Sequence, residues 1–381
     1  MMMGEKSAQF VRQKFAAYYS SHCPLPSDLQ KREFGFGWRD KIDFRHKAFK
    51  SEPELAQFFR NEAPFYASYS VAHYSFPDAQ PMPKKNYLGA DLVFDLDTSY
   101  ENEKHDHNPV LCEYCLDRVR QDALRLKKEF LEEDFGFSTK EITANFSGQK
   151  GYHLHIESAA VQQYSREARR QLLEYVTYKP KMDEMLYKVK ETISRSERDG
   201  KATITRGPAH GDGGWKGKAY RTARKIISEA TEQSLREYGL TKPKITAILE
   251  NKTEILQKLE EGNWEYFKSL EKLWEKMFEQ TTLKGIEADR QVSMDTARLI
   301  RLPESIHGST GFIAKNCDLE KFKPWRDALA FNGKQYAEVA ASDDCSFTIG
   351  TETFSLRKGQ NAGLPEAAAA FIVCKGKATP T

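Results

Sequence analysis

The clearest hydrophobic pattern in the chain is an alternation that runs from residue 87 to residue 97. Every second position from 88 to 96 is apolar, and the positions between them carry Asp91, Val93 and Asp95, with Asp97 at the end. Side chains two residues apart on a β-strand point to the same face of a sheet. The pattern therefore predicts a single strand with one buried apolar face and one acidic face.

Other segments show helical or strand periodicity. Apolar spacing predicts helices over residues 8–20 and 116–133, and a charged helical stretch over 165–198. Residues 33–49 predict a hairpin, residues 142–157 a strand, turn and strand, and residues 296–302 a short strand. A loop rich in Gly and Lys is expected over 199–218, followed by helices over 220–280 that break near 242–244. Strands and a last apolar segment over 367–374 should follow Cys345.

These elements predict a mixed α/β fold in which β-sheets are flanked by helices. Its core would come from two blocks, residues 1–160 and 285–381. The residues between them, 161–284, would form a mostly helical insertion.

Composition narrows the class of protein. The chain has 381 residues, of which 39% are hydrophobic and 30% charged, as in folded globular proteins. A net charge of +3 excludes a uniformly basic binder but allows a local stripe of Lys and Arg. No apolar run reaches the roughly 18 residues of a membrane helix. The N-terminus lacks the apolar stretch of a secretory signal. Scattered cysteines indicate reduced thiols, so we expect a cytoplasmic protein.

Asp95 and Asp97 are the central candidates for chemistry. On one strand their Cα atoms would lie roughly 6–7 Å apart. Like charges at this distance repel unless a cation joins them, and hard divalent ions prefer carboxylate oxygens. A solvent-facing strand with two acids is the simpler alternative. The flanking apolar positions favour a central strand, where unpaired acids are costly.

The turn from Ser147 to His153 is the second candidate. Its glycines let a ligand approach the backbone closely. The Ser147 hydroxyl, Lys150, His153 and the backbone amides are donors suited to phosphate oxygens. An ordinary β-turn is the alternative.

Four segments together resemble the catalytic small subunit of archaeal and eukaryotic-type DNA primase. They are YLGADLVFDLD (87–97), REFGF (32–36) followed by Arg45-His46, SGQKGYHLHI (147–156) and RLIRLPESIHGSTG (298–311), in the family's order and spacing. The resemblance implies a primase-type catalytic domain. Its activity would be template-directed nucleotidyl transfer that makes short RNA primers, with DNA primers as an alternative, for replication.

The resemblance also implies which residues act. Two ions of Mg²⁺ or Mn²⁺ would be held by Asp95, Asp97 and a third aspartate on a strand before residue 298. Asp289 fits that position, and Asp295 is the alternative. Where the family has a basic residue after Ser-Gly, this chain has Gln149 and then Lys150, so Lys150 is the favoured phosphate ligand. The implied nucleotide-binding set is Glu33, Arg45, Ser147, Gln149, Lys150, His153, Arg301 and His307.

A zinc knuckle is expected over residues 105–115. Cys112 and Cys115 have the C-x-x-C spacing of zinc ligands, and His107 precedes Cys112 as in the family. His105 is the expected fourth ligand, with Asp106 as the alternative. A closed set of four ligands would be structural. Two metal-free thiols in a surface loop are the competing interpretation.

The expected partners follow from the same resemblance. They are nucleoside triphosphates, a single-stranded DNA template and an iron–sulfur large subunit in a heterodimer, with no membrane. This chain has no cysteine set for such a cluster. Two rival hypotheses are a stand-alone primase-polymerase of repair or plasmid replication, and a non-catalytic zinc-knuckle protein that binds nucleic acid. The basic segment 201–225 would hold template or be a solvated linker, and docking of the large subunit is the alternative role of the helical insertion.

Overall fold

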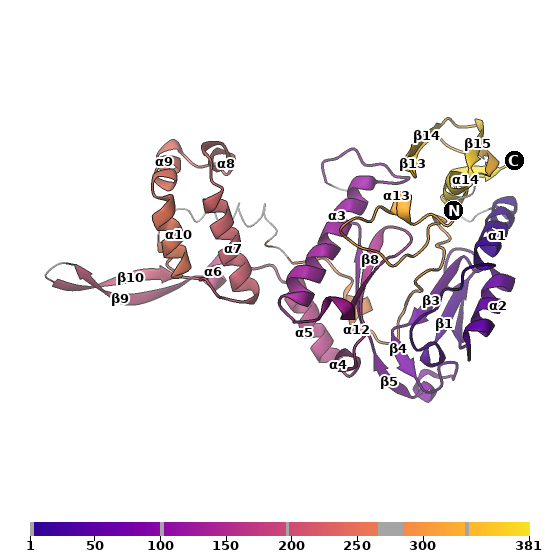
Figure 1. Ribbon diagram of the computed structural model, residues 1–381, viewed down its shortest axis with the longest axis horizontal. Coiled ribbons are helices and arrows are strands. Elements are labelled where there is room, and N and C mark those ends of the chain that lie inside the picture. Colours follow the sequence, from indigo (N-terminus) through magenta and orange to yellow (C-terminus); the bar gives the residue numbers. More distant parts are fainter. Residues whose placement is uncertain (1–3, 100–102, 196–197, 266–282, 284, 332–334) are drawn as a thin grey trace. The chain divides into compact units, whose positions relative to one another are not determined.

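The computed structural model describes residues 4–99, 103–195, 198–265, 283, 285–331 and 335–381. The chain forms two compact units, one from Met1–Leu173 with Glu287–Thr381 and the other from Glu174–Ile286. The sequence placed the corresponding boundaries at 160 and 285. Helix α5 (Arg166–Thr177) therefore begins in the first unit and ends in the second (Figure 1).

The first unit is built on two antiparallel sheets. One has the order β11-β3-β1-β2 and consists of Leu299–Arg301, Tyr66–Ser70, Phe34–Gly37 and Phe44–Lys47. The other has the order β6-β8-β7 and consists of Leu92–Asp97, Gly151–Ile156 and Ile142–Phe146. A short pair, β4 (Ala72–Tyr74) and β5 (Tyr87–Ala90), lies between them in sequence. The mixed α/β class is confirmed.

Helices cover both sheets. Helices α1 (Glu5–Tyr19) and α2 (Glu52–Glu62) lie beside the four-stranded sheet (Figure 1), and Phe15 and Phe59 are fully buried there. Helix α3 (Glu113–Arg125) continues as a π-helical segment, Leu126–Glu132, and packs on β8 and β6. Helix α4 (Ala159–Gln162) contacts β5, and α12 (Arg290–Met294) contacts β6. Strand β6 is an edge strand of its sheet, so the expectation of a central strand is wrong, although α3 and α12 pack against it.

The C-terminal part adds small sheets and a buried helix. Strand β12 (Tyr336–Ala341) lies between β15 (Asn361–Pro365) and β16 (Ala378–Pro380), while β13 (Cys345–Ile349) pairs with β14 (Glu352–Leu356). Helix α13 (Pro324–Asp327) is short. The apolar segment after residue 366 is helix α14 (Glu366–Cys374), which is buried from Ala368 to Cys374 against α1 and β12. Among the described residues, no helix is long and apolar enough to cross a membrane.

The single strand expected over 87–97 is in fact two strands, β5 and β6, which are separated at Asp91. The Asp91 backbone N–H bonds to Val71 O at 3.0 Å. Its carboxylate is buried and pairs with Arg32 at 2.6 Å and His73 at 3.2 Å. Burial raises the pKa of Asp91, but the hydrogen bond from His73 and the charge of Arg32 outweigh it and hold the pKa below its usual value. Asp91 therefore belongs to an internal ion pair and not to the acidic face.

The second unit is only partly helical. The helix expected over 165–198 ends at Thr177, and two strands, β9 (Tyr187–Arg195) and β10 (Arg198–Arg206), follow and pair antiparallel. Six β-branched residues between positions 189 and 205 favour this strand structure, although the charged residues among them resemble a solvated helix. The prediction of a loop over 199–218 is also wrong, because β10 and the start of α7 occupy most of these residues. Helices α6, α7, α8, α9 and α10 span Met182–Met185, Gly214–Ser228, Glu232–Glu237, Lys242–Glu250 and Lys252–Glu260. The helical prediction for 266–280 lies outside the described residues.

Candidate active site

Asp95 and Asp97 project from the C-terminal half of β6, where the strand leaves the core. Asp95 lies opposite His153 of β8, and Asp97 lies opposite Gly151. A Cβ at Gly151 would come within 2.2 Å of Leu96 O and 2.4 Å of Asp97 Oδ1. Only glycine permits this approach, so the start of β8 lies directly against Asp97.

Asp289 lies beside Asp95. Its backbone N–H bonds to Asp95 O at 2.8 Å, and its Oδ1 accepts a hydrogen bond from Gln291 N at 2.8 Å. The expectation that it stands on a strand is wrong, because it is the extended N-cap residue of α12. One backbone bond to β6 holds it in place before the chain turns into the helix. Asp295, the alternative, lies at the other end of α12.

The environment of Asp95 is unfavourable for its negative charge. Burial, followed by repulsion from Asp97 and Asp289, raises the pKa of Asp95 to about 7. Its Oδ1 is buried and accepts no hydrogen bond from the described residues. His153 Nε2 lies 3.4 Å away, but burial holds the His153 pKa well below its usual value, so the ring is neutral. A buried carboxylate oxygen without a hydrogen bond, beside two further carboxylates that pair with Lys150 and Arg298, is an arrangement that a divalent cation would stabilise.

A cavity of about 210 Å³ opens in front of these acids. Eight residues singled out in the sequence line it, namely Asp95, Asp97, Ser147, Gln149, Lys150, His153, Arg301 and His307. Ser68, Val292, Arg298, Leu299 and Ile300 complete the lining. Segments far apart in the sequence thus converge on one space.

The turn between β7 and β8 forms one wall of this cavity. Ser147 Oγ accepts hydrogen bonds from Gln149 N and Gly151 N, at 3.4 Å and 3.1 Å. Gly148 has a φ of +86°, and a Cβ there would lie 2.8 Å from His307 Cβ. Lys150 Nζ is 3.2 Å from Asp97 Oδ2, and its side chain is half exposed. The turn therefore presents a cation beside the carboxylates.

Arg301 and His307 line the same cavity from β11 and from the segment that follows it. Arg301 on β11 pairs with Ser68 on β3, and its guanidinium lies 5.3 Å from the Tyr66 ring centroid. Burial lowers the Arg301 pKa to about 10, so Arg301 remains charged at neutral pH. Burial, then the charge of Arg301, holds the His307 pKa well below its usual value. His307 Nδ1 accepts a hydrogen bond from Ser309 N at 3.2 Å, so Nε2 carries the proton of the neutral ring.

Glu33 and Arg45 do not line the cavity. Glu33 is fully buried, and its Oε1 lies 3.1 Å from Arg45 and 3.2 Å from His46. Arg45 also donates to Ala297 O at 3.3 Å, next to Arg298.

Sequence reasoning did not assign Ser68 to the site, because only its register opposite Arg301 places it there. Arg298 begins the motif over 298–311 but was not assigned to the nucleotide site.

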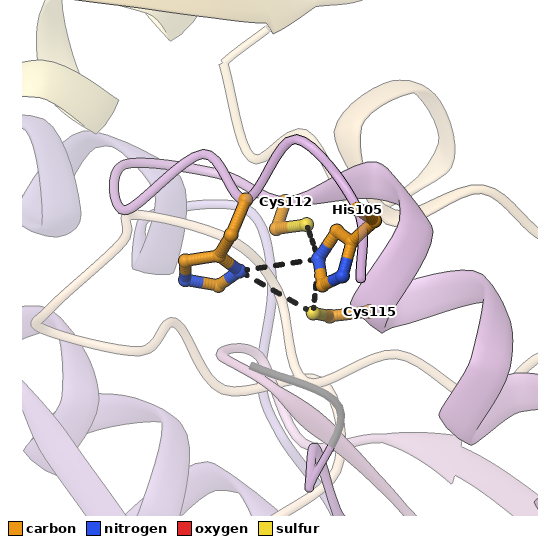
Figure 2. A group of neighbouring side chains, drawn as sticks. His105, Cys112 and Cys115 are labelled. Atoms are coloured by element: carbon orange, nitrogen blue, oxygen red, sulfur yellow. Dashed lines mark hydrogen bonds between the residues drawn. The ribbon is translucent and has the colours of Figure 1, made fainter. Parts of the chain in front are cut away.

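A second cluster lies in the segment before α3. One ligand atom each from His105, His107, Cys112 and Cys115 lies within 4.8 Å of the others. Figure 2 shows the His105 ring directed at both thiols, with Nε2 3.3 Å from Cys112 Sγ and 3.4 Å from Cys115 Sγ. Burial raises the Cys112 pKa, but hydrogen bonds from the Cys115 and Asn108 backbones outweigh it and bring the pKa to about 6. Two sulfur and two nitrogen donors fit a tetrahedral zinc ion.

Comparison with known sequences identifies the family. A sequence model described as "DNA primase small subunit" matches residues 94–319, more than half of the chain. The chain belongs to the DNA primase small subunit family. It is 31% identical to the DNA primase small subunit PriS of Methanothrix thermoacetophila, over 98% of this chain and 99% of that protein. It is also 31% identical to the proteins of the same name from Methanococcoides burtonii and Methanocella arvoryzae, over 99% of each chain. The family match spans Asp95 to His307 and so includes most of the cavity.

Proposed function

We propose that this chain is the catalytic subunit of a DNA primase and joins nucleoside triphosphates into short primers on single-stranded DNA. The observation that carries this proposal is one cavity onto which acidic, basic and hydrogen-bonding side chains converge from β6, β8 and β11. Membership of the primase small subunit family supports it.

Asp95, Asp97 and Asp289 would hold Mg²⁺ or Mn²⁺. When bound, such ions activate an attacking hydroxyl and stabilise the charge on the leaving pyrophosphate. The buried, unbonded Oδ1 of Asp95 is the feature of this chain that fits them. Asp289 extends the donor set from outside the cavity lining, through its position beside Asp95.

The remaining lining residues would bind and orient the nucleotide. Lys150 and Arg301 supply positive charge from the β7–β8 turn and from β11, and preorganised charge of this kind stabilises phosphate oxygens in the transition state. Neutral His307 and His153 would donate or accept hydrogen bonds without adding charge. Ser147 and Gln149 would act mainly through the shape of their turn. Glu33 would act indirectly by holding Arg45 next to the strand that carries Arg301.

Zinc in the His105–Cys115 knuckle would be structural, with His105 in preference to Asp106 as the fourth ligand. The proposed partner is an iron–sulfur large subunit, and the proposed site of action is the cytoplasm. Ribonucleotides are the proposed substrates, and deoxyribonucleotides the alternative.

The test is primer synthesis on single-stranded DNA by the full-length chain, alone and with a large subunit, with Mg²⁺ or Mn²⁺. We expect metal-dependent products that require a template. Asp78→Asn, a change at an exposed carboxylate outside the cavity, should leave the yield unchanged. Synthesis by the chain alone, with no gain from a large subunit, would favour the stand-alone primase-polymerase. No synthesis under any of these conditions would contradict the proposed function.

A further inference from the structure

A larger cavity, of about 710 Å³, lies beside strand β5 and is not used by the proposed chemistry. Its lining comes from Tyr87 at the start of β5, from residues 162–166 between α4 and α5, and from residues 291 and 294–296 of α12 and the segment after it. All of these residues belong to the first unit (Figure 1). The volume is within the range of pockets that bind small-molecule ligands.

The walls of this cavity are fixed by hydrogen bonds around β5. Gln163 Nε2 donates to Leu88 O at 3.1 Å. Gln162 Nε2 donates to Asp91 Oδ1 at 3.2 Å. The buried Arg169 of α5 donates to Asp91 O at 2.8 Å and so ties this helix to the end of β5. A ligand in the cavity would therefore need little further ordering of its walls, which favours binding.

The lining is polar but nearly neutral. Its only charged side chains are Arg166 and Asp295, of opposite sign. Within the described part of the chain, the Oε1 atoms of Gln162 and Gln163 accept no hydrogen bond, and Gln291 Nε2 donates none. Two acceptors and a donor match the mixed donors and acceptors on the edge of a nucleobase. A phosphate chain would be matched less well, because the carboxylate offsets the guanidinium.

Tyr87 adds an aromatic surface to this lining. Its ring centroid lies 6.3 Å from that of the buried Tyr74, and its hydroxyl is hydrogen bonded to the side chain of Thr296. The residue is nevertheless 49% exposed. Unpaired bases of a single strand stack on accessible aromatic rings of this kind. The lining thus offers both a stacking surface and edge contacts to one base.

The 710 Å³ cavity adjoins the 210 Å³ cavity at the acids. Residues 294–296 line the larger cavity, and residues 298–301 line the smaller one. Arg298 N bonds to Asp295 O at 3.2 Å, so the chain turns between the two linings. The Arg298 guanidinium also donates to Gln291 Oε1, in the lining of the larger cavity, at 2.9 Å. Arg298 therefore lies at the boundary between the two cavities.

A second guanidinium lies at this boundary. Arg45 donates to Ala297 O at 3.3 Å, next to Arg298. The side chains of Arg45 and Arg298 are 41% and 39% exposed. Each has one carboxylate neighbour, Glu33 and Asp289 respectively, but a guanidinium has five N–H donors, so others remain for phosphate oxygens. The boundary is therefore suited to the phosphate that joins two adjacent nucleotides of one strand.

We propose that the 710 Å³ cavity binds the unpaired template base that follows the base being copied, with its ring against Tyr87 and its edge on the three glutamine amides. The inference rests on the proposed function, because that function brings a template to the acids. A primer base is a less suitable occupant, since pairing with the template occupies its edge. A free nucleotide offers the same base chemistry, and binding measurements distinguish it from a strand.

The test uses the full-length chain and a primer annealed to a longer template, so that the position of the copied base is fixed. Three templates are compared, namely an intact one, one with an abasic site at the following base and one with an abasic site several positions further along. Fluorescence anisotropy without nucleotides measures the affinities. Tyr87→Leu removes the ring, and Tyr87→Phe keeps it. Tyr336→Leu is the matched control, because Tyr336 is 70% exposed and lines neither cavity.

We expect the wild type to bind the template with the nearer abasic site roughly tenfold more weakly than the intact one, a size typical of one lost base–aromatic stack. The distant abasic site should have no effect. Tyr87→Leu should bind the intact template roughly tenfold more weakly and lose nothing further at the nearer abasic site. Tyr87→Phe and Tyr336→Leu should match the wild type. Equal binding of the two abasic templates by the wild type, or continued discrimination between them by Tyr87→Leu, would overturn the proposal.

Calorimetry with a non-hydrolysable nucleoside triphosphate separates the two sources of a base. Weaker triphosphate binding by Tyr87→Leu, with strand binding unchanged, would assign the cavity to a free nucleotide and overturn the template assignment. Strand binding requires no synthesis. A chain that shows the expected binding pattern but makes no primers would contradict the proposed function and leave the strand subsite standing. A chain that makes primers but binds the two abasic templates equally would contradict the subsite alone.

Discussion

The chain carries two clusters of potential metal ligands near the Ser147–Gly151 turn. They differ in donor chemistry and in access. The carboxylate cluster, Asp95, Asp97 and Asp289, offers hard oxygen donors, and two of its members line the 210 Å³ cavity. The knuckle offers two thiols and two imidazoles whose ligand atoms lie within 4.8 Å of one another. An open set of oxygen donors leaves room for substrate at the metal, whereas a closed set of four N and S donors leaves none.

The two clusters also differ in their effect on the fold without metal. Burial, followed by repulsion from Asp97 and Asp289, makes Asp95 costly to ionise, as its raised pKa shows. The knuckle residues are mostly half-buried and contact each other through hydrogen bonds. One cluster thus concentrates unfavourable charge where chemistry is proposed, and the other joins the segment after β6 to helix α3.

The comparison predicts its largest effect at the acids. Asp95→Asn or Asp97→Asn should lower primer synthesis by about three orders of magnitude, because each removes a hard anionic ligand while keeping side-chain size. The folded structure should persist. The measurement is synthesis at saturating Mg²⁺ or Mn²⁺, with circular dichroism to check folding. Extension near the wild-type rate by either variant would show that the open cluster is not the reaction centre.

For the knuckle we expect the reverse, namely a loss of stability with residual synthesis. Native protein should carry about one zinc per chain, and Cys112→Ser should lose it while residual synthesis survives. A ligand present at about a hundred times its Kd stabilises the folded state by about 2.7 kcal/mol. Loss of zinc should therefore lower the free energy of unfolding by a similar amount. Metal analysis and thermal unfolding measure both effects.

The matched control for the knuckle is Cys345→Ser, which changes a free cysteine outside the cluster. It should retain zinc and stability. His105→Ala should lose zinc and Asp106→Ala should keep it. Carefully prepared protein without zinc would contradict the assignment of the closed cluster.

For the Ser147–Gly151 turn we expect a smaller effect, confined to the use of the nucleoside triphosphate. Lys150→Ala should lower kcat/KM for the nucleoside triphosphate roughly ten- to a hundredfold, because it removes a charge-assisted phosphate contact. Gln149→Ala should cost little and is the matched control on the same turn. Steady-state incorporation beside a single-strand binding titration measures both. Loss of DNA affinity with an unchanged nucleotide dependence would place the turn on the template path instead.

The sequence predicted most elements that depend on short-range patterns. The alternation before Asp95 predicted a buried strand, and the structure has one in β6. It did not reveal that Asp91 interrupts the pattern, because the cause is an ion pair with Arg32, which lies 59 residues away. The strand pair β9 and β10 was missed for a different reason, since the many charged residues in this segment resemble those of a solvated helix.

The cavity shows the same limit at the level of the site. Residues within motifs were found, but Ser68 was not, because its place depends on strand pairing with Arg301. Glu33 and Arg45 were expected in the pocket, yet they pair with each other outside its lining. A motif can indicate that a residue matters, whereas only the fold shows which neighbour it contacts.

The smallest predicted effect concerns pH, and it tests whether the open cluster is costly without metal. The ordinary pKa of Asp95 is 3.8 and the folded-state value is about 7. Below the ordinary value both states bind the proton, and the charge has no effect on stability. Between the two values the folded state alone holds the proton, so stability falls as pH rises, and it levels off above about 7. Asp95→Asn removes this dependence. Metal-free protein with this change should therefore unfold at the wild-type temperature near pH 4 and a few degrees higher near pH 8. Saturating Mg²⁺ should narrow this difference in unfolding temperature, because it stabilises the wild type by binding the folded state.

The control for this pH dependence is Asp78→Asn, which should follow the wild-type curve at each pH. Parallel curves for Asp95→Asn and wild type would mean that the charge of Asp95 is already compensated without metal, and the contrast between the two clusters would then rest on donor chemistry alone.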